Sequence, residues 1–198
     1  MLNQIILPQP QEDLNFPLMQ TLALRRTKRK WKETALSLQE ISNLLWAACG
    51  ITVEETPKSK SKRTAPSARN SQTIKVYIAL PQGLFRYEEK SHVLNQVITD
   101  DIRPYIGTQK MMKSAPAALV YVSDFSKLKG YVGTDDHRKW FVSGTETGFI
   151  SQNVYLYCAA ANLNTVIIGL VDREKLHEIM QLKDHEKVVY TQIVGKAL

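Results

Sequence analysis

The densest group of side chains that could bind a ligand is "RRTKRKWK", residues 25–32, which holds six cations. Arg25, Arg26 and Thr27 would place two guanidinium groups and a hydroxyl within three residues, with Arg29 two positions further on. Arginine binds phosphate through paired, charge-assisted hydrogen bonds, so the spacing suits a terminal phosphate. The same residues could instead form a solvated helix end, where cations favour the negative end of the helix dipole. The spacing alone leaves both interpretations open.

A second basic run, "KSKSKR" at 58–63, adds four cations. The chain carries 26 Lys and Arg against 19 Asp and Glu, so 16 cations remain outside the two runs. The positive charge is therefore local, which favours an anion site over a generally basic surface. Aromatic residues within the first run are limited to Trp31, and no helix-turn-helix or RNA-binding motif accompanies it. We therefore expect no nucleic-acid partner.

Motifs that carry chemistry on their own side chains are absent. The sequence has no G-x-G-x-x-G, Walker, H-E-x-x-H or C-x-x-C pattern. The four histidines show no ligand spacing, so no metal site is predicted, and Ser67 and Ser71 lack the nucleophile-elbow pattern. No activated nucleophile or tuned acid–base pair is visible, and the catalytic residues are unknown. If the protein is an enzyme, we expect a bound cofactor to carry the chemistry.

Two helices are predicted to position the first basic run. "PLMQTLALRR", residues 17–26, has Pro17 at the first helical position, with Leu18, Leu22 and Leu24 facing inward. The second helix begins at a capping box formed by Ser37 and Glu40 and ends at Gly50. Its apolar positions recur at helical spacing: Leu38, Ile41, Leu44, Leu45 and Ala48.

The rest of the chain predicts an α+β domain in which helices outweigh strands. Residues 53–65 have the composition of a mobile surface loop. Strands are expected at 73–80, 117–124 and 187–195, with 83–89 as a hairpin partner and 165–171 as a short extended piece. Helices are expected at 91–102, 108–115, 144–163 and 172–182, the last capped by Asp172. The helix over 144–163 would be apolar on most sides and central to the core.

Length and composition fit one domain of 198 residues. Cys49 and Cys158 lie far apart inside apolar patterns, which indicates reduced core thiols. No apolar run approaches the roughly 18 residues that span a membrane, and the N-terminus does not resemble a signal peptide. We therefore expect a cytoplasmic protein with no membrane partner.

Taken with "RRTKR" at 25–29, "RTAPSARNSQ" at 63–72 resembles the flavin-binding signature of the nitroreductase family, whose members bind FMN. The resemblance continues in order along the chain through "LSLQEISNLLWAACGIT", "SAPAALVYVSD", "TGFISQNVYLYCAAANL" and "VIIGLVD". "LLWAACGIT" and "RYEEKSHVL" look most like the SagB-type dehydrogenase branch, which oxidises azoline rings in modified peptides.

The resemblance implies a site built from three segments of the chain. Residues 25–29 would hold the FMN phosphate and ring edge, and residues 168–169 would offer backbone amides near flavin N5. The turn at 66–72 would form a wall against the ring and bond its polar edge. The implied cofactor-binding residues are Arg25, Arg26, Thr27, Arg29, Pro66, Ser67, Ala68, Asn70, Gln72, Ile168 and Gly169.

Within that set the resemblance gives Arg29 a specific task, because it would approach flavin N1 and O2. A permanently charged guanidinium there would stabilise the negative charge that develops on reduction. Two departures from many relatives stand out: Thr73 replaces a proline after the motif's glutamine, and only Lys196 is available near the end of the chain as a further phosphate cation.

The implied protein is a single FMN-binding domain over residues 1–198, with a mixed, mainly antiparallel sheet wrapped by helices. It would form an intertwined homodimer with both flavin sites at the interface. The implied activity is ping-pong transfer of two electrons from NADH or NADPH to a small-molecule acceptor such as a nitroaromatic or quinone. Two alternatives stay open: an azoline-type dehydrogenase acting on a modified peptide, and a non-catalytic flavin-fold or basic nucleic-acid-binding protein.

Overall fold

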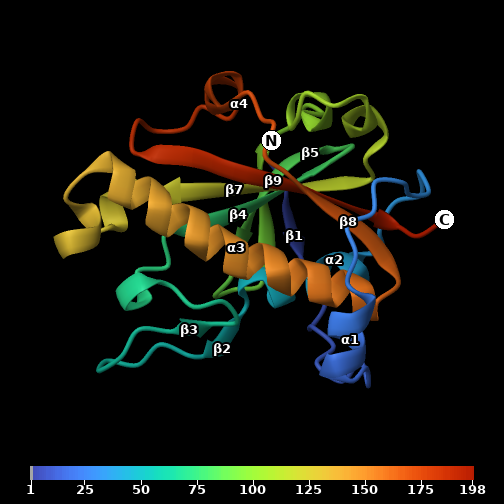
Figure 1. The fold of residues 1–198 in the computed structure, drawn as a ribbon, viewed down its shortest axis with the longest axis horizontal. Helices are drawn as coiled ribbons and strands as arrows, with labels where there is room; N and C mark the ends of the chain where they lie inside the picture. The colour runs from blue at the N-terminus through green and yellow to red at the C-terminus, as the bar shows by residue number, and fades with distance from the viewer. Residues whose placement is uncertain (1) are drawn as a thin grey trace.

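A seven-stranded sheet forms the centre of the protein in the computed structural model, which describes residues 2–198 (Figure 1). Its strand order is β1-β6-β5-β4-β7-β9-β8, and each neighbouring pair is antiparallel. The strands are β1 (Gln4–Ile6), β4 (Ile74–Leu80), β5 (Gly83–Glu88), β6 (Val93–Ile98), β7 (Ala117–Asp124), β8 (Leu163–Ile168) and β9 (Glu186–Lys196). The predicted α+β fold with a mainly antiparallel sheet is confirmed.

The sheet divides the core into two layers, and the inner strand β7 contributes to both. Ala117, Leu119 and Tyr121 point into one hydrophobic cluster, which also contains residues of α2 (Leu38–Cys49) and α3 (Asp136–Ala160). The alternate residues of β7 point into the other cluster, with Trp31 and residues of the 102–115 segment. Because successive side chains of a strand point to opposite faces, β7 is buried on both faces, as its continuous apolar sequence indicates.

Side-chain caps mark the start of three of the helices. The Ser37 hydroxyl accepts a hydrogen bond from the Glu40 amide, and the Glu40 carboxylate accepts one from the Ser37 amide. Asp135 caps α3 and Asp172 caps α4 (Arg173–Ile179) in the same manner. The capping box and the Asp172 cap are thus confirmed. The two cysteines are free and buried, as predicted.

Three predictions about elements are wrong. Residues 91–102 form β6 instead of a helix, because Val93, Leu94 and their neighbours pair with β5 and β1. The spacing of apolar residues in that short segment fits either period, and the hairpin decides it. The residues expected as a loop, 53–65, contain the strand β3 (Lys62–Arg63), which pairs with β2 (Ile51–Val53) in a two-stranded sheet. The described chain has more strands than α-helices, contrary to the prediction.

Helix α1 (Leu18–Leu24) differs from its prediction in the direction it faces. Leu18, Leu22 and Leu24 are exposed in the single chain, and Thr21 is the residue it buries. Leu38 at the start of α2 is also exposed.

Helix α3 begins at Asp136, earlier than predicted, and has Phe141, Phe149 and Gln152 on an exposed side, so it is not apolar and buried all round. The segment predicted as a helix over 108–115 is a short 3-10 turn at Lys110–Ser114. Within residues 2–198, no helix has the length and apolar character that crossing a membrane requires.

Candidate functional site

The arginine-rich bend, residues 25–29, lies along the outer strand of the sheet. The Lys28 amide donates to the Thr165 carbonyl of β8 at 3.0 Å. The Thr27 hydroxyl lies 3.0 Å from the hydroxyl of Tyr155, which also accepts a hydrogen bond from the Ile167 amide at 3.1 Å. The buried Tyr155 therefore joins the bend to the end of β8.

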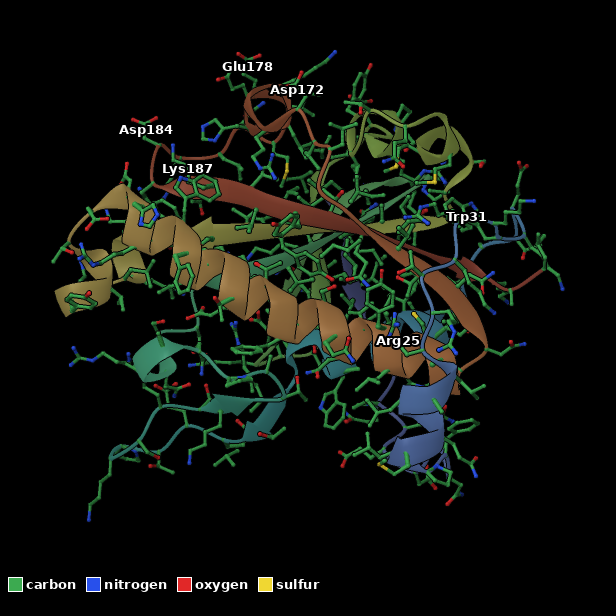
Figure 2. The ribbon with its side chains drawn as sticks, in the orientation of Figure 1. Arg25, Trp31, Asp172, Glu178, Asp184 and Lys187 are labelled. Carbon is green, nitrogen blue, oxygen red and sulfur yellow. The ribbon has the colours of Figure 1, made fainter. Side chains whose placement is uncertain are left out.

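The three arginines of the bend have different surroundings. The Arg26 guanidinium donates to the carbonyls of Ala23 and Arg25, both at 2.8 Å, so it closes the end of α1. The Arg25 guanidinium lies 5.4 Å from the centre of the Tyr155 ring, beside the C-terminal part of α3 (Figure 2). Arg29 is exposed. Of the two interpretations that the sequence left open, Arg26 takes the helix-end role, whereas Arg25 and Arg29 form no ion pair among residues 2–198.

The predicted Ile168 is the last residue of β8, and Gly169 begins the loop after it. Ile168 is buried and Gly169 is exposed, and within the described chain no group accepts a hydrogen bond from the Gly169 amide. Arg173 fixes this loop by donating to the Val189 carbonyl at 2.9 Å and to the Gly169 carbonyl at 3.4 Å. The loop therefore presents a backbone donor next to Tyr155 and the arginine-rich bend.

The second predicted group is the turn at residues 66–72, which is unusually shaped. Arg69, Asn70 and Gln72 all have left-handed backbones, with φ of 52°, 52° and 50°. Side chains other than glycine adopt such angles at an energetic cost that the surroundings must offset. The Gln72 side-chain amide donates to the Ser61 carbonyl at 2.7 Å, and that of Asn70 donates to the same carbonyl at 2.9 Å. Both side chains thus tie the turn to the segment before β3.

A buried carboxylate holds the other side of this turn. Glu146 on α3 is only 3% exposed and accepts hydrogen bonds from the Ala68 amide and the Thr73 hydroxyl, both at 2.8 Å. Desolvation raises the pKa of Glu146, although the hydrogen bonds from Ala68 and Thr73 oppose the rise. Thr73 stands where many relatives have a proline. Its hydroxyl donates to Glu146, a hydrogen bond that a proline could not form.

Sequence reasoning missed Tyr155, Glu146 and Arg173. Glu146 carried a visible signal, because it is the only charged residue between Lys139 and Asp172. A lone carboxylate in an otherwise uncharged stretch of sequence needs a partner when it is buried. Tyr155 and Arg173 carried no such signal, since their partners are backbone groups distant in sequence.

The two predicted groups do not meet within one chain. Glu146 holds the turn beside β4, whereas Tyr155 holds the bend beside β8, and β7 and β9 lie between those strands. Nine residues of helix separate the two side chains by about 14 Å and about half a rotation. The structure therefore places the two predicted groups on opposite flanks of α3, and we refer to each group as a proposed half-site.

The remaining titratable candidates have structural partners. His92 lies within hydrogen-bond distance of Ser42, Tyr87 and the Pro8 carbonyl, and burial lowers the pKa of His92. Lys196 lies 3.5 Å from Glu40 of the capping box. In the part of the chain that the structure describes, no three His, Cys, Asp or Glu side chains are grouped to hold a metal ion.

Known proteins match this chain over most of its length. A family model described as the nitroreductase family matches residues 22–196. A curated protein of Methanocaldococcus jannaschii, named as a candidate nitroreductase, is 24% identical over 192 residues, which cover 92% of this chain and 91% of that protein. A crystal structure of a candidate nitroreductase from Ralstonia eutropha is 35% identical, with a TM-score of 0.88 over 98% of this chain and 90% of its own.

A more distant solved structure shares the fold alone. The NADPH:FMN oxidoreductase of Vibrio harveyi, solved with NAD⁺, is 16% identical, with a TM-score of 0.63 over 90% of this chain and 68% of its own.

Proposed function

Because the chain belongs to the nitroreductase family and is a flavin-dependent oxidoreductase, we propose that it binds FMN between the two half-sites of different copies. Bound FMN would supply two-electron transfer, accepting from NADH or NADPH and then passing the electrons to a nitroaromatic, quinone or similar acceptor. The observation that carries the proposal is the pair of half-sites on opposite flanks of α3. A second copy of the chain would bring the turn of one subunit to the bend of the other.

The residues of the first half-site suit the polar parts of FMN. Arg25 and Thr27 offer a guanidinium and a hydroxyl for a phosphate, and Arg29 adds a permanent charge for the pyrimidine edge. The exposed Gly169 amide is a donor without an acceptor in the described chain, as a hydrogen bond to a ring nitrogen requires. Tyr155 and Arg173 position these groups without needing to contact the cofactor.

The residues of the second half-site suit the face of a planar ring. Pro66, Ser67 and Ala68 are small, so backbone and ring could approach closely. Glu146 and the Ser61 carbonyl fix the turn from two sides. This half-site therefore orients the cofactor and excludes water, which are the contributions a protein makes to flavin chemistry.

An azoline-type dehydrogenase remains a subclass of the proposed activity and would not need a nicotinamide donor. A non-catalytic, nucleic-acid-binding role would instead need a continuous basic surface. In the second basic run Arg63 does not contribute to such a surface, because it pairs with Glu89 at 2.9 Å and is mostly buried.

The test is an absorbance spectrum of the purified protein, followed by FMN titration and reduction with each nicotinamide. We expect flavin absorbance, quenching of FMN fluorescence on binding, and bleaching by NADH or NADPH. A colourless protein that leaves FMN fluorescence unchanged would overturn the proposal.

A further inference from the structure

A cavity lies beside the 66–72 turn. It has a volume of about 670 Å³, within the range of small-molecule sites, and is bounded by residues 55–61, the turn itself and residues 126–132. Its charged lining is almost entirely cationic and consists of Lys60, Arg69, Lys90, Lys127 and Lys129, with Glu55 as the single acid. We call these residues and the space between them the basic cleft.

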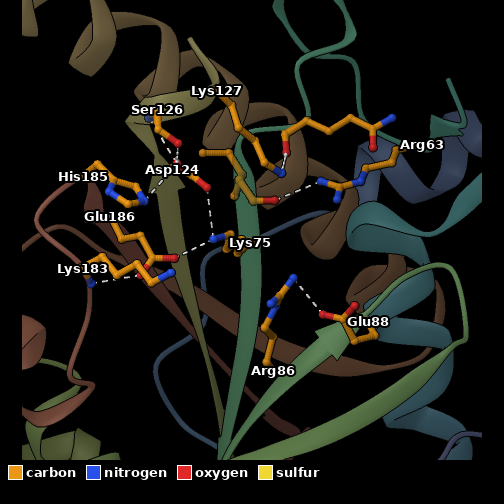
Figure 3. Close-up of polar contacts among 12 residues, drawn as sticks. Arg63, Lys75, Arg86, Glu88, Asp124, Ser126, Lys127, Lys183, His185 and Glu186 are labelled. Atoms are coloured by element: carbon orange, nitrogen blue, oxygen red, sulfur yellow. Dashed lines mark hydrogen bonds and ion pairs between the residues drawn. The ribbon is translucent and has the colours of Figure 1, made fainter.

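Most of this charge is not neutralised by the protein. Glu55 pairs with Lys90, which leaves four cations of the basic cleft with no ion pair among residues 2–198. The Lys127 ammonium donates to the Gln72 carbonyl at 3.3 Å (Figure 3). Desolvation lowers the pKa of Lys127, and the charges of Arg63 and Lys75 add to this effect, whereas the carboxylates of Asp124 and Glu89 oppose it. Such a cluster favours an anion between its members.

The backbone of the cleft is shaped around Arg69. The left-handed backbone conformation of Arg69 is unusual for arginine, and the neighbouring Gly130 has φ of +64°. A Cβ on Gly130 would lie 3.0 Å from an Arg69 guanidinium nitrogen. The glycine therefore leaves the space that the guanidinium occupies. The Ser71 hydroxyl oxygen, also in the lining, is buried and has no hydrogen-bond partner in the described residues.

We propose that the basic cleft binds a phosphate group of the small molecule that exchanges electrons with the flavin, an inference that rests on the proposed function. Phosphate is the chemistry that fits, because a dianion can contact several cations and hydroxyl donors at once. The cleft shares Ala68, Asn70 and Gln72 with the 66–72 turn of the second half-site, so its occupant would lie beside the cofactor. The phosphate could belong to the 2′ position of NADPH or to a phosphorylated acceptor.

The test is calorimetric titration of the full-length protein with adenosine 2′,5′-bisphosphate, adenosine 5′-monophosphate and inorganic pyrophosphate. The cleft variant is Lys60→Gln with Lys129→Gln. The matched control is Lys58→Gln with Lys62→Gln, which removes the same charge from exposed positions outside the cleft. We expect the cleft variant to weaken phosphate binding about tenfold or more and the control to change it about twofold at most. Arg69→Asn, which retains the left-handed backbone, should act like the cleft variant.

The ligands separate the two sources of phosphate. Preference for the 2′,5′-bisphosphate over the 5′-monophosphate supports NADPH, whereas pyrophosphate binding without that preference supports a phosphorylated acceptor. Equal affinity in the cleft variant and the control, or no binding of any of the three, would overturn the cleft assignment. So would a loss of FMN affinity confined to the cleft variant, because the cofactor's own phosphate would then occupy the cleft. Phosphate binding by a protein that takes up no flavin would overturn the proposed function and leave the phosphate site standing.

Discussion

Glu146 and Tyr155 lie on one helix and hold two separate half-sites on its opposite flanks. Glu146 accepts hydrogen bonds from the turn before β4, and Tyr155 bridges the arginine-rich bend and the end of β8. Neither residue needs to contact a ligand to matter. Each fixes a segment whose own residues are predicted to contact the cofactor.

We expect Tyr155→Phe to weaken FMN binding by roughly tenfold, a loss of about 1.4 kcal/mol. The substitution removes the hydroxyl between Thr27 and the Ile167 amide while keeping the ring under Arg25. The Ile167 donor would be left without a partner, which should also cost about 1–3 kcal/mol in free energy of unfolding. Fluorescence titration with FMN and urea unfolding measure the two effects.

Tyr157→Phe is the matched control on the same helix, because the Tyr157 hydroxyl donates to the Glu40 carbonyl of α2, at 3.3 Å, and not to the bend or β8. We expect it to leave the dissociation constant for FMN unchanged. If Tyr155→Phe and Tyr157→Phe bind FMN equally well, Tyr155 does not position the bend.

Replacing Glu146 should separate its hydrogen bonds from its charge. Glu146→Ala leaves the Ala68 amide and the Thr73 hydroxyl without their acceptor, and we expect it to lower the free energy of unfolding by about 2–4 kcal/mol. Glu146→Gln can still accept from Ala68 while its amide donates to Thr73, so it should stay within about 1 kcal/mol of the parent. Urea unfolding at neutral pH distinguishes the two substitutions.

The pH dependence gives a second readout for Glu146. Because burial raises the pKa of this carboxyl in the folded state, it stabilises the fold less as pH rises above its ordinary value of about 4.3. Glu146→Gln should therefore gain stability relative to the parent between about pH 4.3 and the raised pKa. A constant difference across that range would mean that the carboxyl is not perturbed by folding.

An ion-pair network fixes the start of the 125–132 segment that lines the basic cleft (Figure 3). The Lys75 ammonium lies 2.5 Å from a Glu186 carboxylate oxygen and 3.2 Å from one of Asp124, and all three side chains are mostly buried. Lys75→Met would leave two carboxylates without their cation, and we expect a loss of about 3–5 kcal/mol in free energy of unfolding at pH 7. The more exposed Arg86–Glu88 pair provides the control: Arg86→Met should cost about 0–1 kcal/mol.

Acid should remove the contribution of this network. Desolvation acts to raise the pKa of Asp124 and of Glu186, but hydrogen bonds from Ser126 to Asp124 and from Lys75 to both outweigh it, so both pKa values are lowered. Carboxyls with lowered pKa stabilise the fold above their unfolded values of about 4 and lose that effect as pH falls through the folded values. The difference between the parent and Lys75→Met should shrink below about pH 4. A difference that persists at low pH would contradict the role of the charges.

Patterns within short stretches of sequence predicted much of this fold. The S-x-x-E capping box, the Asp172 cap and the continuous apolar run of β7 each depend on neighbours, and each was confirmed. Residues 91–102 were mistaken for a helix because their apolar spacing fits two periods, and only pairing with β5 decides between them.

The candidate site was partly visible in the same way. The arginine-rich bend and the 66–72 turn stood out by composition, but their supports did not. Tyr155 acts on Thr27, which is 128 positions away, and Glu146 acts on Ala68 across 78 positions. Such contacts follow from the topology of the sheet and the placement of α3, which local patterns do not encode. The exposed leucines of α1 show the same limit, since amphipathic spacing does not reveal which surface covers a helix.

The last prediction tests whether one flavin site draws on two copies. Arg25→Ala with Arg29→Ala damages the first half-site, and Ala68→Phe blocks the wall of the second. We expect each variant alone to bind FMN at least about tenfold more weakly than the parent, from the loss of charge-assisted hydrogen bonds in one case and from steric exclusion in the other. Thermal unfolding of each variant verifies that it is folded.

When the two variants are coexpressed in equal amounts, half of a randomly assorted population of dimers would contain one chain of each kind. Every such dimer would join an intact bend from the Ala68→Phe chain to an intact turn from the other. FMN titration should therefore find about a quarter of the parent's tight sites restored. If both halves of a site came from one chain, each variant would damage every site it formed, and coexpression would restore none.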